Sequence, residues 1–121
     1  MTLPLKIKAT GRVVLTPELR AFIAEKLGKI EKLIGSAEKA ALVEVEVESG
    51  TKSRDGGPFR AEVNLTISKK LLRAEARRSS LHEAVDEAIL ELRRELRRLM
   101  TKRRDTARRD ARRYRSREKS A

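Results

Sequence analysis

The sequence predicts an α+β fold, in which a four-stranded mixed sheet and two helices on one of its faces form a two-layer sandwich. Apolar residues recur at helical spacing in two segments and alternate with polar residues in four others, in the order β-α-β-β-β-α. Because each predicted strand has only one apolar face, both helices are expected on the same side of a single sheet, a dsRBD-like arrangement. The 121 residues suffice for one such domain with a modest core.

The first strand and the first helix are predicted for residues 3–9 and for the segment that begins at Thr16. Residues 3–9 alternate apolar and polar side chains, as a strand with one solvent-exposed face does. Thr16 is placed to cap the helix, Pro17 suits its first position, and Gly35 suits its end. Its apolar residues are Leu19, Phe22, Ile23, Leu27, Ile30, Leu33 and Ile34. A helix between the first two strands implies a right-handed crossover, so these strands are expected to be parallel.

The remaining three strands are predicted to form an antiparallel meander. Valines alternate with glutamates in residues 42–48, and apolar residues alternate with polar ones in residues 59–67. Residues 49–58 are rich in turn-forming side chains and are expected to make a long hairpin loop between these strands. A tight turn at residues 69–70 then leads into the fourth strand, at residues 72–77.

The outer face of this sheet is predicted to carry a lattice of ion pairs. Glutamates of the second strand face Arg60, and arginines of the fourth strand lie on its other side. Cross-strand pairs of this kind contribute about 0.2–1 kcal/mol each, so we interpret the lattice as structural. The residues expected in it are Glu44, Glu46, Glu48, Arg60, Arg73 and Arg77.

The longest apolar stripe predicts the last helix, over residues 80–104. Its expected core positions are Leu81, Val85, Ala88, Ile89, Leu92, Leu96 and Leu99. Acidic residues gather near its start and cationic residues near its end, an order that complements the helix dipole. An ordinary solvent-exposed face would explain the arginines. Against that explanation, the acidic partners run out after Glu95 and the cationic density continues into the tail.

More than half of the net charge lies in the last sixth of the chain. Residues 101–121 carry ten Lys and Arg against three Asp and Glu, which is +7 of the total of +12. We therefore expect a domain of residues 1–104 followed by a basic, flexible C-terminal tail of residues 105–121. Without an apolar stripe the tail cannot pack, although Asp105 and Asp110 are spaced to support a helical extension. It is a solubilising end or, as we favour, an arm that becomes ordered on phosphate.

The charge of +12 and a pI near 10.7 indicate a polyanionic partner, since binding to phosphates releases counterions. A basic helix at a membrane surface is disfavoured, because the chain has no Trp and the basic helix needs its leucines for the core. Absence of cysteine excludes disulfides and thiolate chemistry. No segment resembles a signal peptide or an apolar span of about 20 residues, so a cytoplasmic protein without a membrane partner is expected.

The few aromatic residues narrow the kind of nucleic acid that the chain can bind. Phe22 and Phe59 fall on inward-facing positions, which leaves only Tyr114 for stacking on bases. No helix-turn-helix or zinc-finger spacing is present, so specific DNA recognition has no supporting motif. Recognition is therefore expected to rest on backbone phosphates and on the shape of folded or duplex RNA.

No catalytic site, metal site or cofactor is predicted, and no small-molecule substrate. His82 is the only histidine, with Ser79 and Ser80 beside it, but a catalytic triad needs a third group in a defined tertiary arrangement. Glu83, Asp86 and Glu87 resemble acid–base carboxylates or metal ligands, yet their place in the first turns is explained by the helix dipole. No second cluster of His or Cys converges on them.

Two segments resemble the ribosome hibernation promoting factor and ribosome-associated inhibitor family. They are residues 9–32, which contain A-T-G-R-V-V-L-T-P-E-L-R-A-F-I and E-K-L-G-K-I-E-K, and residues 83–96, from E-A-V-D to L-R-R-E-L. The resemblance spans about residues 5 to 104. It implies a β-α-β-β-β-α domain that lies in the channel of the small ribosomal subunit. There it would occupy the path of mRNA and tRNA, contact rRNA, and silence idle ribosomes.

The resemblance also implies which residues contact RNA. Carried over by position, these are Arg20, Lys26, Lys29, Arg93, Arg94, Arg97, Arg98 and Lys102. The neighbouring cations Arg77, Arg78, Arg103 and Arg104 complete the expected set. Many relatives have an aromatic residue at the start of the last helix, where this chain has His82.

Long members of the family append a second domain that joins two ribosomes, whereas only the basic tail follows here. We therefore expect a short-form protein that occupies single ribosomes and is a monomer when free. The alternative is a protein-interaction module that self-associates through its last helix, whose leucine spacing also suits a coiled coil. The width of the stripe and its alanines favour packing on a sheet instead.

Overall fold

The computed structural model describes residues 3–35, 41–50 and 57–120 of the chain. Within these ranges it contains the two helices and four strands that the sequence predicts, in the predicted order. Their bounds are β1 (Leu5–Gly11), α1 (Pro17–Ile34), β2 (Leu42–Ser49), β3 (Phe59–Ile67), β4 (Lys70–Arg78) and α2 (Leu81–Ser120). Part of the expected loop at residues 49–58 lies outside the described residues.

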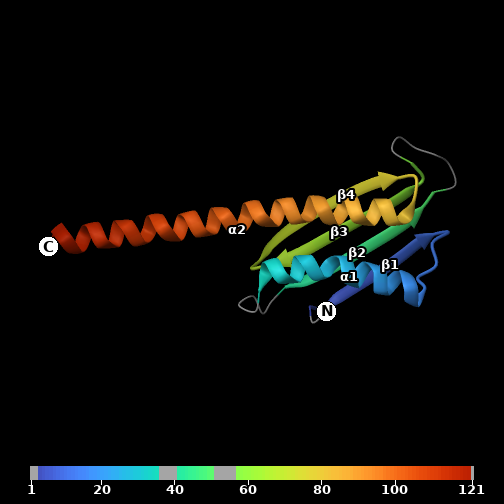
Figure 1. Ribbon diagram of the computed structural model, residues 1–121, viewed down its shortest axis with the longest axis horizontal. Helices are drawn as coiled ribbons and strands as arrows, with labels where there is room; N and C mark the ends of the chain where they lie inside the picture. The colour runs from blue at the N-terminus through green and yellow to red at the C-terminus, as the bar shows by residue number, and fades with distance from the viewer. Residues whose placement is uncertain (1–2, 36–40, 51–56, 121) are drawn as a thin grey trace.

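The sheet has the strand order β1-β2-β3-β4 (Figure 1). Strand β1 pairs parallel with β2, whereas β2–β3 and β3–β4 are antiparallel. The parallel pair follows from the α1 crossover, and the meander follows from the two hairpins. Both predictions of strand direction are confirmed.

The ends of α1 are capped as the sequence predicts. The Thr16 hydroxyl oxygen accepts a hydrogen bond of 3.1 Å from the Leu19 N–H, and Pro17 occupies the first turn. At the other end Gly35 has a φ of +73°, and its N–H donates to the Glu31 carbonyl oxygen over 3.0 Å. These caps satisfy backbone groups that a helix terminus otherwise leaves unpaired.

The turn between β3 and β4 lies one residue earlier than predicted. Ser68 and Lys69 have φ values of +48° and +65°, as the two central residues of a type I′ hairpin turn require. Lys70 is consequently the first residue of β4, where it pairs with Ile67, rather than part of the turn. The strand thus starts two residues before its predicted boundary at residue 72.

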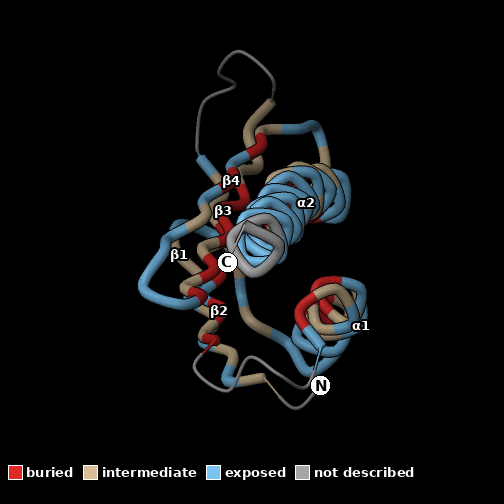
Figure 2. Tube along the Cα trace, turned by 90° about the vertical axis from the view of Figure 1, so that its left-hand side faces the viewer, coloured by how far each residue is buried: buried red, intermediate tan, exposed pale blue. Residues whose placement is uncertain are grey.

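Both helices cover one face of the sheet and leave the other face open (Figure 2). Helix α2 lies close to β3 and β4. Ala74 and Ala76 of β4 and Ala84 and Ala88 of α2 are buried in the same core, and such small side chains allow the two layers to approach. All seven of the predicted core positions of α2 are buried or packed against the core, which confirms the orientation of its apolar stripe.

On the open face, Arg60 is the centre of the predicted ion-pair lattice. Its guanidinium donates to Glu62 on the same strand and, over 2.8 Å, to Glu75 on β4. It also lies 3.6 Å from carboxylate oxygens of both Glu46 and Glu48 on β2. The lattice differs from the prediction in its members. Glu44 is exposed and lies outside the lattice. Arg73 pairs with Glu62, and on β4 the residue that contacts Arg60 is Glu75 rather than one of the predicted arginines.

Helix α2 does not end at Arg104, as the apolar stripe predicted, but continues to Ser120 (Figure 1). The stripe marked only the part that packs on the sheet. Beyond it the chain contains neither Gly nor Pro, and its many Ala and Arg residues favour helix. A helix that is already nucleated needs no new nucleus to propagate, so it extends without tertiary contacts. Flexibility of residues 105–121 in solution stays a prediction.

Candidate RNA-binding surface

One flank of α2 faces α1, and two contacts fix their relative rotation. The rings of Phe22 and His82 meet edge to face with centroids 4.4 Å apart, and Lys26 Nζ lies 3.2 Å from Asp86 Oδ1. The Lys26 ammonium is also 5.5 Å from the centroid of the Phe22 ring. We call the surface along this contact the seam. It is formed by Phe22, Lys26 and Lys29 of α1 and by His82, Asp86, Arg93, Arg97 and Arg104 of α2.

Several predicted RNA-binding residues belong to the seam. Three arginines lie on the same side of α2 as Asp86, because they follow it by close to two, three and five helical turns. They are Arg93, Arg97 and Arg104. Lys29 stands one turn after Lys26 and therefore also faces α2. Lys26 itself is paired with Asp86, which makes it a link between the helices rather than a free cation.

Arg20 is not brought to the seam. It precedes Phe22 by two residues, which on a helix is a rotation of about 200° away from the side that contacts α2. The side chain is exposed on the opposite flank of α1. The expectation that Arg20 adjoins the arginines of the last helix is therefore wrong, although it remains available for a partner that wraps around α1.

The other flank of α2 carries arginines in ion pairs. Arg94 and Arg98 each lie 2.7 Å from a glutamate three residues earlier, Glu91 and Glu95. At the start of this flank Arg78 lies 3.6 Å from Glu87, and it donates over 2.6 Å to the Arg77 carbonyl oxygen. Exposed pairs of this kind contribute at most about 1 kcal/mol, so a phosphate can compete for these arginines.

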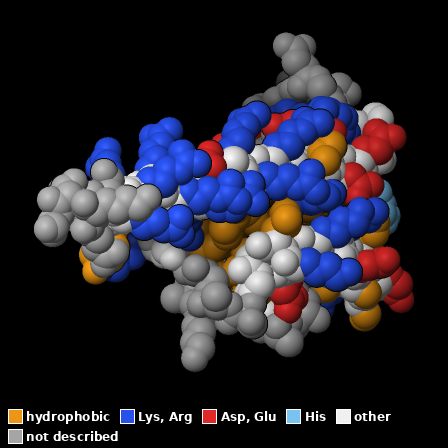
Figure 3. All heavy atoms as spheres, turned by 60° about the vertical axis from the view of Figure 1, so that its left-hand side comes forward, with side chains coloured by type: hydrophobic (Ala, Val, Ile, Leu, Met, Phe, Trp, Pro, Cys, Tyr) orange, Lys and Arg blue, Asp and Glu red, His pale blue; other side chains and the backbone are white. Residues whose placement is uncertain are grey.

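Unpaired cations lie between and beyond these pairs. Among the residues that the structure describes, Arg97, Lys102 and Arg104 are exposed and have no ionic partner. The half-buried Arg93 holds its Nε atom away from solvent with no hydrogen-bond partner in that same part of the chain. Figure 3 shows the resulting band of Lys and Arg side chains along α2, with few acidic side chains beside it.

The polar residues that were considered for catalysis serve to start α2. The Ser80 hydroxyl oxygen accepts from the Glu83 N–H over 3.2 Å, and Ser79 donates to the Glu83 carboxylate over 3.2 Å. These are capping interactions of a helix N-terminus. His82 is exposed apart from its contact with Phe22. Within the described ranges, no group of three His, Cys, Asp or Glu could hold a metal ion.

Aromatic side chains offer no stacking platform on the sheet. Phe22 and Phe59 are partly buried and pack against the core, as predicted, whereas Tyr114 is 66% exposed on the projecting part of α2. None of the helices, so far as the chain is described, is long and apolar enough to cross a membrane. The described surface of the two-layer domain therefore offers cations for phosphate rather than aromatic rings for base stacking.

Sequence reasoning did not single out Lys70 as a candidate binding residue. The sequence predicts Lys70 in a turn, whereas the hairpin places it at the start of β4, beside Lys102 and Arg103 of α2. No sequence signal marked this register, because Ser68 and Lys69 adopt the φ values of a type I′ turn without the Asn-Gly or Asp-Gly pair that favours it.

A family model described as sigma 54 modulation protein / S30EA ribosomal protein matches residues 7–104. Among solved structures, the N-terminal domain of Protein Y from Thermus thermophilus is 20% identical, with a TM-score of 0.66 over 82% of this chain and 99% of that one. A ribosomal subunit interface protein from Coxiella burnetii is 15% identical, with a TM-score of 0.67 over the same shares of the two chains. These structures share the fold. No curated protein matches the chain.

Proposed function

Because the chain belongs to the sigma 54 modulation protein / S30EA ribosomal protein family, we propose that it is a ribosome hibernation factor. It binds the small ribosomal subunit in the channel of mRNA and tRNA and inhibits translation in idle cells. The protein acts by occupancy and not by catalysis. Its contacts are made to rRNA phosphates by the cations of α1 and α2.

The observation that carries this proposal is a set of exposed α2 cations that have no ionic partner among the described residues. Arg97, Lys102 and Arg104 are exposed and unpaired among the described residues, on a helix that the sheet holds in place. A phosphate that binds these groups releases counterions from RNA, and this entropy gain makes binding strong at low salt. The guanidinium groups also form bidentate hydrogen bonds that suit phosphate oxygens.

The two-layer domain supports the proposal by fixing where the cations point. The contacts of Phe22 with His82 and of Lys26 with Asp86 lock the rotation of α1 against α2. Lys29, Arg93 and Arg97 are thereby presented together along the seam. The helices that carry these cations need no rearrangement on binding, so only the side chains become ordered, which suits a partner of fixed shape such as folded rRNA.

Co-sedimentation with purified small ribosomal subunits tests the proposal. The protein should pellet with subunits at low salt and be released at high salt. R93Q/R97Q/R104Q should weaken binding by at least about tenfold and lower the salt slope by about 2, since each lost phosphate contact removes about 0.7–0.9. The matched control K6Q/K8Q/R12Q removes the same charge from exposed positions of β1 and the following turn and should retain most binding. Binding that is absent at low salt, or indifferent to salt, would contradict the proposal.

A second assay separates binding at the channel from binding elsewhere on the subunit. Added protein should inhibit cell-free translation, and it should protect from chemical probing the rRNA nucleotides that line the mRNA and tRNA path. The seam variant should lose both effects and the β1 control should keep them. Protection confined to the outer surface of the subunit would leave ribosome binding intact and refute the channel.

Self-association through α2 is the alternative, and the burial of its apolar stripe within the domain supports a monomer instead. Leu92, Leu96 and Leu99 are buried against the sheet and α1 within one protomer. The face that remains exposed is cationic and repels a second copy of itself. A molar mass measured by light scattering distinguishes the two functions, because a constitutive dimer without affinity for RNA would favour the alternative.

A further inference from the structure

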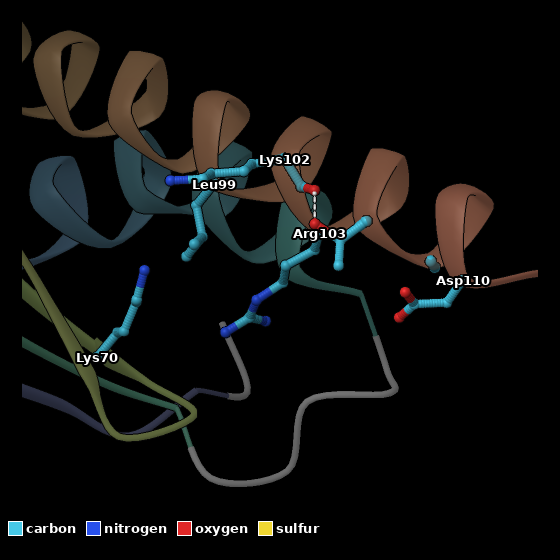
Figure 4. A pocket seen from close by; sticks show the side chains of 7 residues that line it. Lys70, Leu99, Lys102, Arg103 and Asp110 are labelled. Atoms are coloured by element: carbon cyan, nitrogen blue, oxygen red, sulfur yellow. Dashed lines mark hydrogen bonds between the residues drawn. The ribbon is translucent and has the colours of Figure 1, made fainter. Parts of the chain in front are cut away.

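The last turns of α2 project beyond the sheet, and we call residues 105–120 the extension. Figure 4 shows Leu99 pointing from α2 toward the sheet, with Asp110 about three turns further along the helix. Residues 105–115 are all exposed, so their side chains take no part in the core. The family model that matches the chain ends at residue 104, and the extension lies beyond it.

The extension carries a single aromatic residue, Tyr114, which is 66% exposed. Ala107 and Ala111 precede it by seven and three residues and therefore lie on the same side of the helix. A helical side chain leans over the preceding turn, and an alanine there covers little of an aromatic ring. The ring of Tyr114 is therefore accessible to a partner, and nothing in the core requires it.

Cations lie on both flanks of this ring. Arg113 and Arg115 are its neighbours in sequence, which places each about 100° around the helix from Tyr114, one on either side. Both are exposed and have no ionic partner in the part of the chain that the structure describes. Asp110 lies one turn before Tyr114, so phosphates are expected at the two arginine flanks and not over that turn.

An exposed ring between two unpaired guanidinium groups restricts the chemistry of the partner. The partner must be anionic, and it must present flat π-surfaces. A single-stranded nucleic acid has both, because its unpaired bases stack on aromatic side chains while its phosphates bind Arg. A duplex keeps its base faces inside its own stack, and an acidic polysaccharide has no bases. A second copy of the extension is excluded by its like charge.

We propose that the extension binds single-stranded RNA, with an unpaired base stacked on Tyr114 and the phosphates on either side of that base held by Arg113 and Arg115. This site goes beyond the proposed function, in which the seam binds the phosphates of folded rRNA. Tyr114 follows Leu99 by 15 residues, a distance of about 22 Å along the helix. The domain and the extension can therefore hold different segments of RNA.

The intrinsic fluorescence of the protein tests the stacking directly. The chain contains one Tyr and no Trp, so this emission comes from Tyr114 alone. A short single-stranded RNA of mixed sequence should quench it at low salt, after correction for absorption by the RNA, because a stacked base quenches an aromatic fluorophore. An abasic strand of the same length carries the same phosphates and should bind with little quenching. Equal quenching by the RNA and the abasic strand, or by the RNA and its duplex, would overturn the proposal.

Two replacements of the ring separate stacking from bulk. Y114L keeps an apolar side chain without a π-face and should weaken binding of the RNA at least about fivefold, the lower end for one stacked base. Y114F keeps the ring and should stay within about twofold of the wild type. The control V14A shortens a side chain that is 74% exposed outside α2 and should change nothing. A loss in Y114F equal to that in Y114L, or no loss in Y114L, would refute stacking. Fluorescence anisotropy of a labelled RNA measures these affinities.

The same comparison is repeated in the seam variant R93Q/R97Q/R104Q, in which the domain contributes fewer phosphate contacts. The effect of Y114L should be at least as large there, because the extension then supplies more of the binding. An effect of Y114L that vanishes in the seam variant would show that Tyr114 acts only through the seam, and the separate site would be refuted.

A pair of charge variants tests the two flanking arginines. R113Q/R115Q should lower the salt slope of RNA binding by about 1.4, since each phosphate contact on a single strand contributes about 0.7. The matched control R109Q/R112Q removes the same charge from positions about 140° or more around the helix from Tyr114. It should lower the slope by less than half as much. Equal decreases would mean that only the net charge of the extension matters, and the proposal would fail.

A nucleoside monophosphate identifies the source of the base. It should quench Tyr114 far more weakly than the RNA at equal base concentration, because it lacks the second phosphate and the counterion release of a strand. Equal quenching would assign the site to free nucleotides and overturn the proposal of an RNA chain.

Co-sedimentation separates this inference from the proposed function. If the wild-type protein pellets with small subunits but single-stranded RNA does not quench Tyr114, the stacking site fails while the hibernation function stands. If the RNA quenches Tyr114 and Y114L weakens its binding, but the protein does not pellet with subunits, the stacking site stands while the hibernation function fails.

Discussion

Arg60 donates a hydrogen bond to Glu62, two residues further along β3. Glu62 is the middle member of a row of three carboxylates that crosses the sheet. Glu62 is directly opposite Glu46 on β2 and Glu75 on β4, so three acidic residues are neighbours across three strands. Glu62 is only 5% exposed. Like charges in direct register destabilise a sheet, and the Arg60 guanidinium compensates by contacting all three.

Replacement of Arg60 is therefore expected to be costly. R60M removes the cation that contacts the buried Glu62 carboxylate and the two carboxylates next to it. Loss of one partner of a buried ion pair lowers the free energy of unfolding by about 3 kcal/mol. The control R73M removes the other arginine that contacts Glu62, which is 62% exposed, and should cost less than about 1 kcal/mol. Urea denaturation at neutral pH measures both. Similar values for the two variants would refute the central role of Arg60.

The same cluster predicts a dependence of stability on pH. The hydrogen bond from Arg60 lowers the pKa of Glu75, and although burial raises the pKa of Glu62, hydrogen bonds from Arg60 and Asn64 outweigh it and leave that pKa below 4.5. Groups with a lowered folded pKa contribute stability above their unfolded value, which is lost as the pH falls through the folded value. The wild-type protein should therefore lose stability as the pH falls below 4.5.

Without Arg60 this acid dependence should weaken. In R60M the adjacent carboxylates repel one another. Their protonation therefore removes this repulsion and stabilises the folded state, whereas in the wild type it breaks ion pairs with Arg60. The difference in unfolding free energy between wild type and R60M should shrink as the pH is lowered from about 7 to about 3. Urea denaturation at each pH measures it, and a difference that stays constant would show that the lattice contributes nothing to the pH dependence.

Two glycines should respond to alanine in opposite directions. Gly11 has a φ of +64°, and an added Cβ would clash with the Ser49 carbonyl oxygen, so G11A should destabilise by about 1–3 kcal/mol. Gly28 lies inside α1 with open space where its Cβ would be, so G28A should stabilise by up to about 1 kcal/mol. Thermal unfolding of both variants compares them. A stabilising G11A would contradict the observed close approach of β1 to β2.

Removal of residues 105–121 should separate stability from binding. Residues 105–115 are all exposed, so truncation after Arg104 should leave the free energy of unfolding within about 0.5 kcal/mol of the full chain. Affinity for polyanions should nevertheless fall and its salt slope should decrease, because residues 105–121 hold seven Lys and Arg against three Asp and Glu, which is +4 of the charge of +12. Urea denaturation and heparin binding at several salt concentrations measure the two effects. A large loss of stability would instead indicate that the extension packs on the domain.

The sequence was sufficient to predict the fold because each element carried its own periodicity. The alternating valines of β2 and the leucine stripe of α2 each have one apolar face, and this alone places both helices on one side of the sheet. The end of α2 could not be predicted in this way. A stripe records where a helix packs, whereas α2 continues to Ser120 and its residues 105–115 are all exposed.

The candidate site was less predictable, because it depends on the rotation of one helix against another. Sequence spacing grouped Arg20 with Lys26 and Lys29, whereas the contacts between the two helices show which side of α1 faces α2. Lys70 illustrates the same limit, since it joins Lys102 and Arg103 through a hairpin register that composition does not contain.

The length of the uninterrupted helix α2 sets the minimum length of any binding cavity that encloses the protein. Its 40 residues, at 1.5 Å each, form a rod about 60 Å long, roughly twice the diameter of a small domain. A cavity that encloses the whole molecule must therefore measure about 60 Å in at least one direction, and from a shorter one the end of the helix must project.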